Sequence, residues 1–273
     1  MSITGVAEIN GAQLWYEVAG EGFPLVLIHA GIADHRLWDQ QFDVFAQAYK
    51  VIRYDLRGFG DSTFPDGDYA HYLDLHGLLE HLYISQAHLC GVSMGGTTAI
   101  DLAISDLKAV KSLIVVGSSA SGFTPQQTAD EIAKAEAINA QWDALYEAGK
   151  LEEASELEMQ LWVDGPRDHT QVNQAVRALV NDMNLKALRK YNSKTTYKKL
   201  EPPAVDRLGE IDLPALIMVG GLDTSNARKS ATYLATHIRG AENVVMEGLT
   251  HVPNMEEPEK FNRIVIDFLA NIR

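Results

Sequence analysis

The sequence predicts an α/β fold: a mostly parallel sheet of eight strands that is flanked by helices. Three observations lead to this fold. Short apolar runs alternate with helical patterns, most of these runs are apolar throughout, and an Asn-Gly pair near the start of the chain indicates a hairpin. The predicted strands are residues 6–9, 13–18, 25–29, 51–54, 87–90, 112–116, 215–219 and 244–246.

The first two strands are predicted to pair antiparallel, because Asn10-Gly11 between them favours a two-residue hairpin turn. The run 25–29 is apolar until it ends at His29, and such runs suit strands that are buried on both faces of a parallel sheet. Helical patterns such as 72–82 and 261–272 lie between the strands and are expected to cover the sheet.

The alternation stops once, between Ser121 and Ile211, where no strand pattern is found. Helical stretches cover residues 126–147, 151–162 and 171–190, and they are separated by Gly149 and by Gly165-Pro166. Some 90 residues are too many for a simple crossover. We therefore predict a helical cap over residues 121–211, inserted between the sixth and seventh strands, and a core made of residues 1–120 and 212–273.

Composition narrows the classes of function. The chain has 273 residues, 46% of them hydrophobic, and a formal net charge of −14, which disfavours nucleic acid and anionic membranes as partners. Its one cysteine, Cys90, cannot form an intrachain disulfide and lies in a predicted buried strand. No apolar run approaches the roughly 20 residues of a membrane span, and residues 1–5 lack the pattern of a signal peptide. A soluble, cytoplasmic protein is expected.

Gly91-Val92-Ser93-Met94-Gly95 is the motif that points most directly to chemistry. It matches G-x-S-x-G and lies between the predicted strand 87–90 and a predicted helix at 96–104, which is the context of a nucleophile elbow. Such a turn exposes the serine hydroxyl and directs the N–H of Met94 at the reacting centre. Ser93 is therefore the predicted nucleophile.

A serine nucleophile needs a base and an orienting acid. Asp223 follows the predicted strand 215–219, and His251 follows the strand 244–246. Along the chain, the nucleophile Ser93 comes first, the acid Asp223 second and the base His251 third, which is the order found in one α/β architecture that carries a catalytic triad. All three residues come after the carboxyl ends of parallel strands, where such sheets form their sites. Asp206 and Asp212 are the next candidates for the acid. Gly31, after the third strand, is expected to donate a second backbone N–H, beside that of Met94, to an oxyanion hole.

With these motifs the chain resembles the α/β-hydrolase superfamily over nearly its whole length. The matching segments are His29-Ala30-Gly31, Asp55-x-Arg57-Gly58-x-Gly60-x-Ser62, Gly91-x-Ser93-x-Gly95-Gly96, Asp223 and His251. It is most similar to the capped bacterial carboxylesterases and lactonases, including relatives of 3-oxoadipate enol-lactonase.

The resemblance also marks differences. The family usually has His-Gly where this chain has His29-Ala30, which leaves Ile32 as an alternative to Gly31 as the oxyanion donor. Haloalkane dehalogenases and epoxide hydrolases of the superfamily use an aspartate nucleophile, so Ser93 argues against those activities. Some members place the acid after an earlier strand, but here that strand is followed by Gly117-Ser118-Ser119 without a carboxylate.

Other residues have simpler interpretations. An Arg–Asp pair in Asp55-Leu56-Arg57-Gly58 is expected to fix a loop, and His29 to shape the oxyanion loop. Trp142 and Trp162 in the cap either line a pocket or pack, and Ile32, Trp162 and Val252 are the predicted substrate-binding residues. The remaining histidines have no metal-ligand spacing, and no metal motif is found; they are His35, His71, His76, His81, His88, His169 and His237.

The sequence thus predicts a serine hydrolase without cofactor or metal that cleaves a small-molecule ester or lactone through an acyl-enzyme. The alternatives are hydrolysis of a C–C bond or acyl transfer by the same triad, or a ligand-sensing protein that keeps the fold and turns over slowly. The sequence gives no basis for an oligomeric state.

Overall fold

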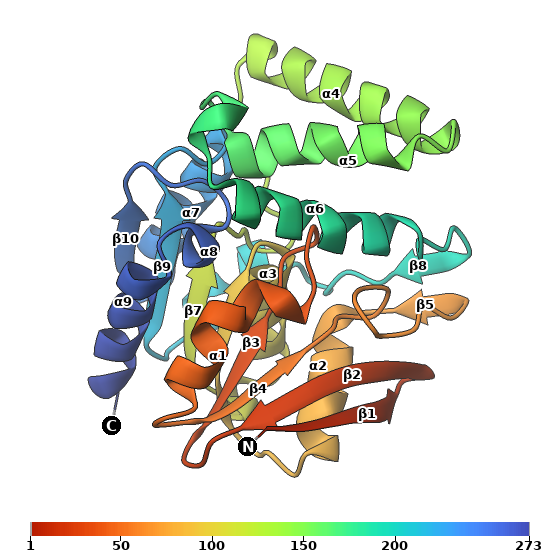
Figure 1. Cartoon of the computed structure of the whole chain (residues 1–273). Coiled ribbons are helices and arrows are strands. Elements are labelled where there is room, and N and C mark those ends of the chain that lie inside the picture. The colour runs from red at the N-terminus through yellow and green to blue at the C-terminus, as the bar shows by residue number, and fades with distance from the viewer. Residues whose placement is uncertain (1, 273) are drawn as a thin grey trace.

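The computed structural model describes residues 2–272 and contains one large mixed sheet (Figure 1). Its strand order is β1-β2-β4-β3-β6-β7-β9-β10. The pairs β1–β2 and β2–β4 are antiparallel, and every other neighbouring pair is parallel. The predicted fold class is therefore confirmed. The strands are β1 (Ile3–Ile9), β2 (Ala12–Ala19), β3 (Pro24–Ile28), β4 (Lys50–Tyr54), β6 (Ala87–Val92), β7 (Val110–Val116), β9 (Ala215–Gly220) and β10 (Glu242–Met246).

The central strands are buried on both faces, as their apolar sequences predict. Every residue of β6 and β9 is buried, and alternate side chains enter different halves of the core. Leu89 packs in one apolar cluster, for example, whereas its neighbour Cys90 packs in the other. The sheet thus forms a rigid middle layer whose strand ends are fixed in position.

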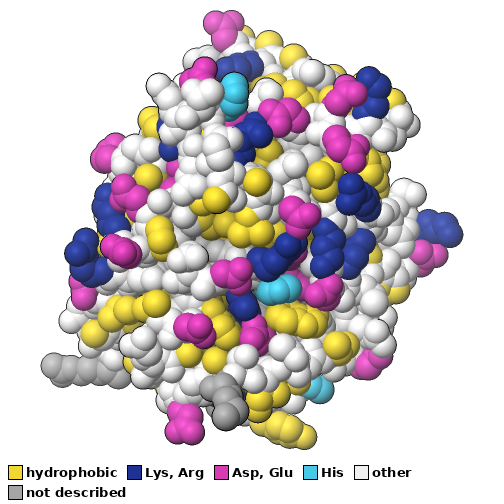
Figure 2. Space-filling view, in the orientation of Figure 1, with side chains coloured by type: hydrophobic (Ala, Val, Ile, Leu, Met, Phe, Trp, Pro, Cys, Tyr) yellow, Lys and Arg dark blue, Asp and Glu magenta, His cyan; other side chains and the backbone are white. Residues whose placement is uncertain are grey.

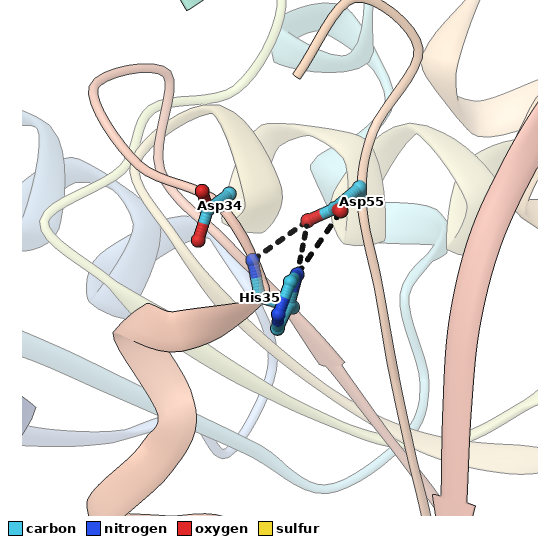
Figure 3. A group of neighbouring side chains, drawn as sticks. All are labelled: Asp34, His35 and Asp55. Atoms are coloured by element: carbon cyan, nitrogen blue, oxygen red, sulfur yellow. Dashed lines mark hydrogen bonds and ion pairs between the residues drawn. The ribbon is translucent and has the colours of Figure 1, made fainter. Parts of the chain in front are cut away.

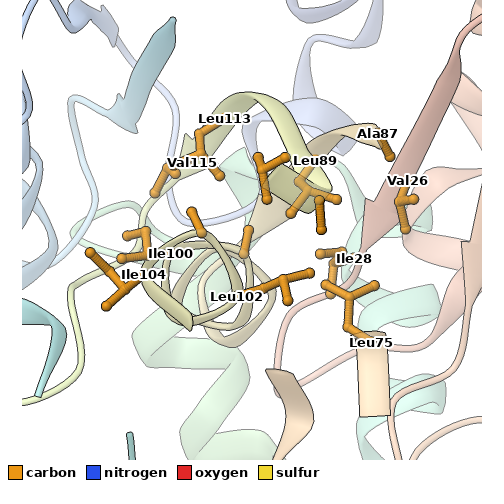
Figure 4. Close-up of a cluster of buried hydrophobic side chains, with 14 of the residues drawn as sticks. Val26, Ile28, Leu75, Ala87, Leu89, Ile100, Leu102, Ile104, Leu113 and Val115 are labelled. Atoms are coloured by element: carbon orange, nitrogen blue, oxygen red, sulfur yellow. The ribbon is translucent and has the colours of Figure 1, made fainter. Parts of the chain in front are cut away.

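Helices cover both faces of this sheet. On one face lie α2 (His71–His81), α3 (Met94–Ser105) and α7 (Ser225–His237), and Figure 4 shows Ile100 and Leu102 of α3 near Leu89 of β6. On the other face lie α1 (Asp39–Phe45) and α9 (Pro258–Ala270), whose buried Phe261, Val265 and Phe268 have the spacing of one helix face. Short turns complete the chain: η1 (His35–Trp38), η2 (Leu107–Ala109), η4 (His169–Gln171), η5 (Ala204–Asp206), η6 (Leu208–Glu210) and the short helix α8 (Pro253–Glu256).

Between β7 and β9 the chain forms three helices and a π-helical turn. These are α4 (Ala129–Glu147), α5 (Leu151–Met159), η3 (Gln160–Asp164) and α6 (Gln174–Leu188). Figure 1 shows the three helices stacked beyond the carboxyl ends of the parallel strands. We use the name cap for residues 121–211.

The two ends of the cap lie side by side. Val205 N donates to Ser121 O at 3.0 Å, and Ala204 N donates to Ser121 Oγ at 3.1 Å. The Ser121 hydroxyl in turn donates to Asp101 Oδ1 of α3 at 2.6 Å. The chain therefore leaves the sheet layer and returns to it at one point beside α3.

Ion pairs join the cap to the rest of the molecule. Arg36 lies 2.8 Å from Asp182 of α6, and Lys186 of the same helix lies 2.7 Å from Asp61. Figure 2 shows basic and acidic side chains next to one another across this face. Such exposed pairs contribute little each, so we assign most of the docking to apolar contacts of Met159, Val163, Val180 and Met183 in the buried core.

One expectation is wrong in detail, because the cap contains a strand. Thr195–Tyr197 forms β8, which pairs in parallel with β5 (Gly67–Tyr69) in a separate two-stranded sheet. Each strand has only three residues, and all six residues are exposed or half-buried. Segments this short show no periodicity, so the pairing is set by tertiary contacts and not by a local pattern.

The predicted core also included Met1 and Arg273, which lie outside the described residues. Within residues 2–272, no helix is both long enough and apolar enough to cross a bilayer.

Candidate active site

Ser93 lies between the end of β6 and the start of α3 and has a strained backbone. Its φ of 53° and ψ of −115° are rare for a residue with a side chain. A Cβ at Gly91 would collide with the backbone of Gly95, and one at Gly95 would collide with the carbonyl of Ile28. The glycines of the motif are therefore needed because the turn packs directly against neighbouring backbone, and Ser93 N is fixed by donating to Val116 O at 2.8 Å.

Asp223 and His251 meet at the ends of β9 and β10. His251 Nδ1 lies 2.8 Å from Asp223 Oδ2, and the two residues are only 3% and 5% exposed respectively. The other carboxylate oxygen accepts from Thr224 N at 2.6 Å. Because a carboxylate only accepts hydrogen bonds, Nδ1 carries the proton and Nε2 is left as a base. Asp206 and Asp212, the alternative candidates for the acid, are both exposed. Asp212 lies 3.9 Å from Arg239 and not beside His251.

Ser93 and His251 line one cavity of about 220 Å³. Its walls come from α3, from the loop after β7, from the start of α7 and from the cap, which contributes Trp162. Gly117, in that loop, packs closely against the His251–Asp223 pair. A Cβ on Gly117 would lie 3.0 Å from Asp223 Oδ2 and 3.1 Å from His251 Nδ1. The structure thus brings together the three residues predicted as the triad and one predicted substrate-binding residue.

The cap contacts the histidine directly. The ring centroids of Trp162 and His251 are 4.5 Å apart, and His251 N donates to Trp162 O at 3.2 Å. The preceding Thr250 hydroxyl lies 3.0 Å from Val163 O and 2.7 Å from Glu256 Oε1. Arg167 pairs with Glu256 at 2.6 Å. Residues 162–167 therefore position the loop that carries His251.

The two predicted oxyanion donors belong to segments that contact each other through the Met94 side chain. A Cβ on Gly31 would lie 2.9 Å from Cε of Met94, so the loop after β3 lies against the elbow. Met94 is the first residue of α3, and its N–H therefore has no acceptor within the helix. Gly31 N makes no backbone hydrogen bond in the described turns and loops.

The other predicted binding residues lie elsewhere. Ile32 and Val252 are 6% and 0% exposed, pack in the apolar core and are not among the residues that line the cavity. Trp142 stacks on Tyr146 of its own helix, with ring centroids 5.1 Å apart. Of the two cap tryptophans, the structure places Trp162 at the cavity.

His29 fixes the oxyanion loop through a neutral imidazole. Its Nε2 accepts from Leu56 N at 2.9 Å, so Nδ1 is the protonated nitrogen and donates to Ala30 O at 2.8 Å. The side chain is fully buried, and this burial lowers its pKa. The ring thus ties the segment after β3 to the segment after β4.

The motif after β4 also has a structural arrangement, although its pairing differs from the expected one. Arg57 pairs with Asp74 of α2 at 2.7 Å, not with Asp55. Asp55 instead accepts from His35 N at 2.8 Å and from Asp61 N at 2.7 Å. Sequence spacing suggested the nearer acid, but α2 brings Asp74 to the guanidinium.

Asp34, His35 and Asp55 form the one described group whose side chains are close enough to bind a metal together (Figure 3). Both oxygens of Asp34 already accept from Arg36, at distances down to 2.7 Å. Burial alone would raise the pKa of the Asp55 carboxyl, but both of its oxygens accept from His35 or Asp61, and with these bonds its pKa is lowered. A metal would have to displace these donors, so the donor set does not favour a cation.

Most of the residues that line the cavity are not among the predicted site residues. Two examples are Gly117, in the segment whose lack of a carboxylate is described above, and Asn226, in the first turn of α7. The available clue for Asn226 was its closeness in sequence to Asp223. Its side-chain Oδ1 is buried without a hydrogen-bond partner.

Known proteins resemble this chain over most of its length. It is 27% identical over 268 residues to 3-oxoadipate enol-lactonase 1 of Acinetobacter baylyi, covering 97% of this chain and 96% of that protein. It is also 27% identical over 277 residues to the 2-hydroxy-6-oxononadienedioate/2-hydroxy-6-oxononatrienedioate hydrolase of Paraburkholderia xenovorans, covering 95% and 91%. These relatives support a hydrolase activity for the chain.

The solved structures agree on the fold. The crystal structure of the enol-lactonase from Burkholderia xenovorans LB400 superposes with a TM-score of 0.81 at 24% identity, covering 98% of this chain and all of that one. Residues 25–264 match the sequence model of the alpha/beta hydrolase family. Because this match extends from β3 into α9 and includes the elbow, Asp223 and His251, the chain belongs to the alpha/beta hydrolase family.

Proposed function

We propose that the chain is a serine hydrolase that cleaves carboxylic esters or lactones. One observation carries this proposal: Ser93, on its strained elbow, shares a cavity with the buried His251–Asp223 pair. A nucleophile, a base and an orienting acid in this order are the parts that acyl transfer requires. The enol-lactonase relatives support a lactone or an ester as the substrate.

The reaction follows from the arrangement of these groups. His251 Nε2 takes the hydroxyl proton of Ser93 while Oγ attacks the ester carbonyl, and the carbonyl oxygen becomes an anion near the N–H groups of Met94 and Gly31. The C–O bond then breaks, and His251 returns the proton to the leaving alkoxide. Water repeats the two steps on the acyl-enzyme and releases the acid. Asp223 keeps the proton on Nδ1 and stabilises the imidazolium.

Hydrolysis of a C–C bond is the second candidate, because one relative acts on 2-hydroxy-6-oxo compounds by its name. The same residues would then act on a carbonyl whose leaving group is a carbon. Comparing turnover of a panel of p-nitrophenyl esters and lactones with turnover of a 2-hydroxy-6-oxodienoate separates the two. Faster turnover of the esters and lactones supports the first candidate.

The decisive test of the proposal is the variant Ser93→Ala. It should abolish covalent labelling by a fluorophosphonate and reduce ester turnover by several orders of magnitude, because no other group can form the acyl-enzyme. The matched control is Ser119→Ala, which removes another hydroxyl lining the same cavity and should retain labelling. Persistent labelling of Ser93→Ala would overturn the assignment.

A further inference from the structure

A short segment at the start of the cap forms part of the wall of the cavity that holds Ser93. Phe123 and Pro125, in the connection between β7 and α4, line this cavity. The start of α7 contributes further lining residues, among them Asn226 and Ser230. The position of the segment relative to α7 therefore determines part of the room available beside Ser93.

The same segment is bonded to α7 next to these lining residues. Glu131, in the first turn of α4, has its Oε1 2.9 Å from Lys229 Nζ and accepts a hydrogen bond from Ser225 Oγ at 2.8 Å. Lys229 Nζ also donates to Gln126 O at 2.9 Å. Ser225 and Lys229 each directly precede a residue that lines the cavity of Ser93. We use the name latch for the ion pair of Glu131 with Lys229.

The latch is held more firmly than an isolated ion pair at the surface. The Glu131 carboxylate also accepts from Thr128 N at 2.8 Å, and Thr128 Oγ1 accepts from Glu131 N at 3.2 Å, which completes a capping box. Its own helix thus orients the carboxylate toward one conformation, so the pair loses less side-chain freedom when it forms. The side chains of Lys229 and Glu131 are also only 38% and 31% exposed.

A second cavity, of about 510 Å³, borders the same wall. It shares Phe123 and Pro125 with the cavity of Ser93, and its lining includes both residues of the latch. The ring of Phe123 packs on Tyr233 of α7, with centroids 4.4 Å apart, and Tyr233 lines the second cavity as well. Movement of the wall away from α7 would therefore let a longer group extend from the first cavity toward the second.

We propose that the latch limits the length of the substrate by holding the wall of Phe123 and Pro125 beside α7. The cavity of Ser93 has only about 220 Å³, whereas ligand cavities typically have roughly 300–1,000 Å³, so the preferred substrates have short chains. Glu131 and Lys229 do not line the cavity of Ser93 and act through the wall, which makes them positioning residues. This inference rests on the proposed function and names the size class of its substrate.

Two chain-length series test the proposal in the two parts of an ester. p-Nitrophenyl butanoate and octanoate differ in the acyl chain, and butyl and octyl acetate differ in the alcohol. In the series whose variable chain faces the wall, the shorter compound should have the higher kcat/KM. Lys229→Met should raise the ratio of kcat/KM for the longer to the shorter compound in that series by about tenfold, because the released wall admits the longer chain.

Three further variants separate the wall from the latch. Phe123→Ala shortens the wall itself and should raise the same ratio by about tenfold or more. Phe123→Leu removes less of the side chain, keeps a folded protein available if the alanine variant does not fold, and should raise the ratio less. Glu131→Gln retains an acceptor for the capping box but loses the charge of the latch, and should raise the ratio by about threefold.

The matched control is Lys186→Met, which makes the same substitution in another ion pair between cap and core. The Lys186 side chain is 36% exposed and lies 2.7 Å from Asp61, and neither residue lines the cavity of Ser93. This variant should leave the ratio within about a factor of two of the wild-type value. An equal increase in Lys186→Met and Lys229→Met would overturn the latch, because any loosening of the cap would then have the same effect.

The other outcomes keep this inference distinct from the proposed function. A wild-type protein that prefers the longer compound in both series overturns the size class. An unchanged ratio in both series in folded Phe123 variants overturns the wall, and an unchanged ratio in Lys229→Met overturns the latch. Labelling at Ser93 still supports the hydrolase in each of these cases, whereas absence of both turnover and labelling removes the proposed function and the inference with it.

Discussion

The elbow of Ser93 and the loop of His251 are positioned by different parts of the molecule. The backbone of the elbow is fixed by the sheet layer: Gly95 packs on the Ile28 carbonyl, and Ser93 N donates to Val116 O of β7. The loop of His251 bonds instead to Trp162 and Val163 in the cap. The difference teaches that the cap does more than lie over Ser93, because it also helps to place His251, the proposed base.

Among the variants that test this comparison, the largest expected loss of activity comes from Asp223, the proposed acid, which contacts His251. Asp223→Asn keeps the shape of the side chain but favours the wrong imidazole tautomer, and kcat should fall by up to about 10⁴. The measurement is kcat for a p-nitrophenyl ester at neutral pH, with a melting curve to show that the fold is intact. Near wild-type kcat in a folded variant would mean that the orienting acid is another residue.

A smaller loss is expected when the bond between the cap and the histidine loop is removed. Thr250→Val deletes the hydroxyl that contacts Val163 O and Glu256, so His251 should be less well placed and kcat should fall by about tenfold. The matched control is Thr98→Val in α3, which is equally buried and donates to Met94 O at 2.8 Å.

Thr98→Val should leave kcat within about a factor of two, because the elbow backbone is fixed by its glycines and by β7. Equal losses in the two threonine variants, at equal thermal stability, would break the distinction between the two regions.

The smallest effect on turnover is expected at Asp101, which lies in α3 where the ends of the cap meet. Burial raises the pKa of this carboxyl to about 6, and its Oδ2 has no partner. Since the folded pKa is above the usual value of 3.8, the folded state binds the proton more tightly than the unfolded state. The contribution of this carboxyl to the free energy of unfolding therefore falls by about 3 kcal/mol in total as pH rises from well below 4 to well above 6.

Asp101→Asn should remove this slope without changing kcat. Urea unfolding of both proteins at pH 4.5 and 7.5 measures the effect as the difference between the two free energies of unfolding. A variant that keeps the wild-type slope would show that other groups cause it.

The sequence predicts what depends on local pattern. The eight strands and the cap helices follow from apolar runs and helical periodicity, and the elbow follows from Gly91, Ser93 and Gly95 in one segment. The pairing of His251 with Asp223 could be anticipated because parallel strands bring their carboxyl ends together. Their catalytic roles remain predictions that the variants above test.

Features set by distant contacts could not be predicted in this way. Trp142 and Trp162 both lie in helical segments of the cap, and the sequence does not distinguish them. Of the two, Trp162 lines the cavity, because the position of its side chain depends on how α5 and η3 dock on the sheet. The partner of Arg57 and the pairing of β5 with β8 likewise join segments that no local pattern connects. The position of Asn226 at the cavity could not be predicted either, because α7 and the cap enclose this space only in the folded protein.

The meeting of Ser121 with Ala204 and Val205 has a consequence for how such enzymes can diverge. An insertion whose two ends lie a hydrogen bond apart can be exchanged or resized in evolution or by domain grafting without moving a strand of the sheet. The graft is constrained near His251, however, since a new insert must again offer a carbonyl to the N–H of His251, as Trp162 does here. Recombined enzymes that retain residues 162–167 should therefore keep a competent base while their substrate range changes with the rest of the insert.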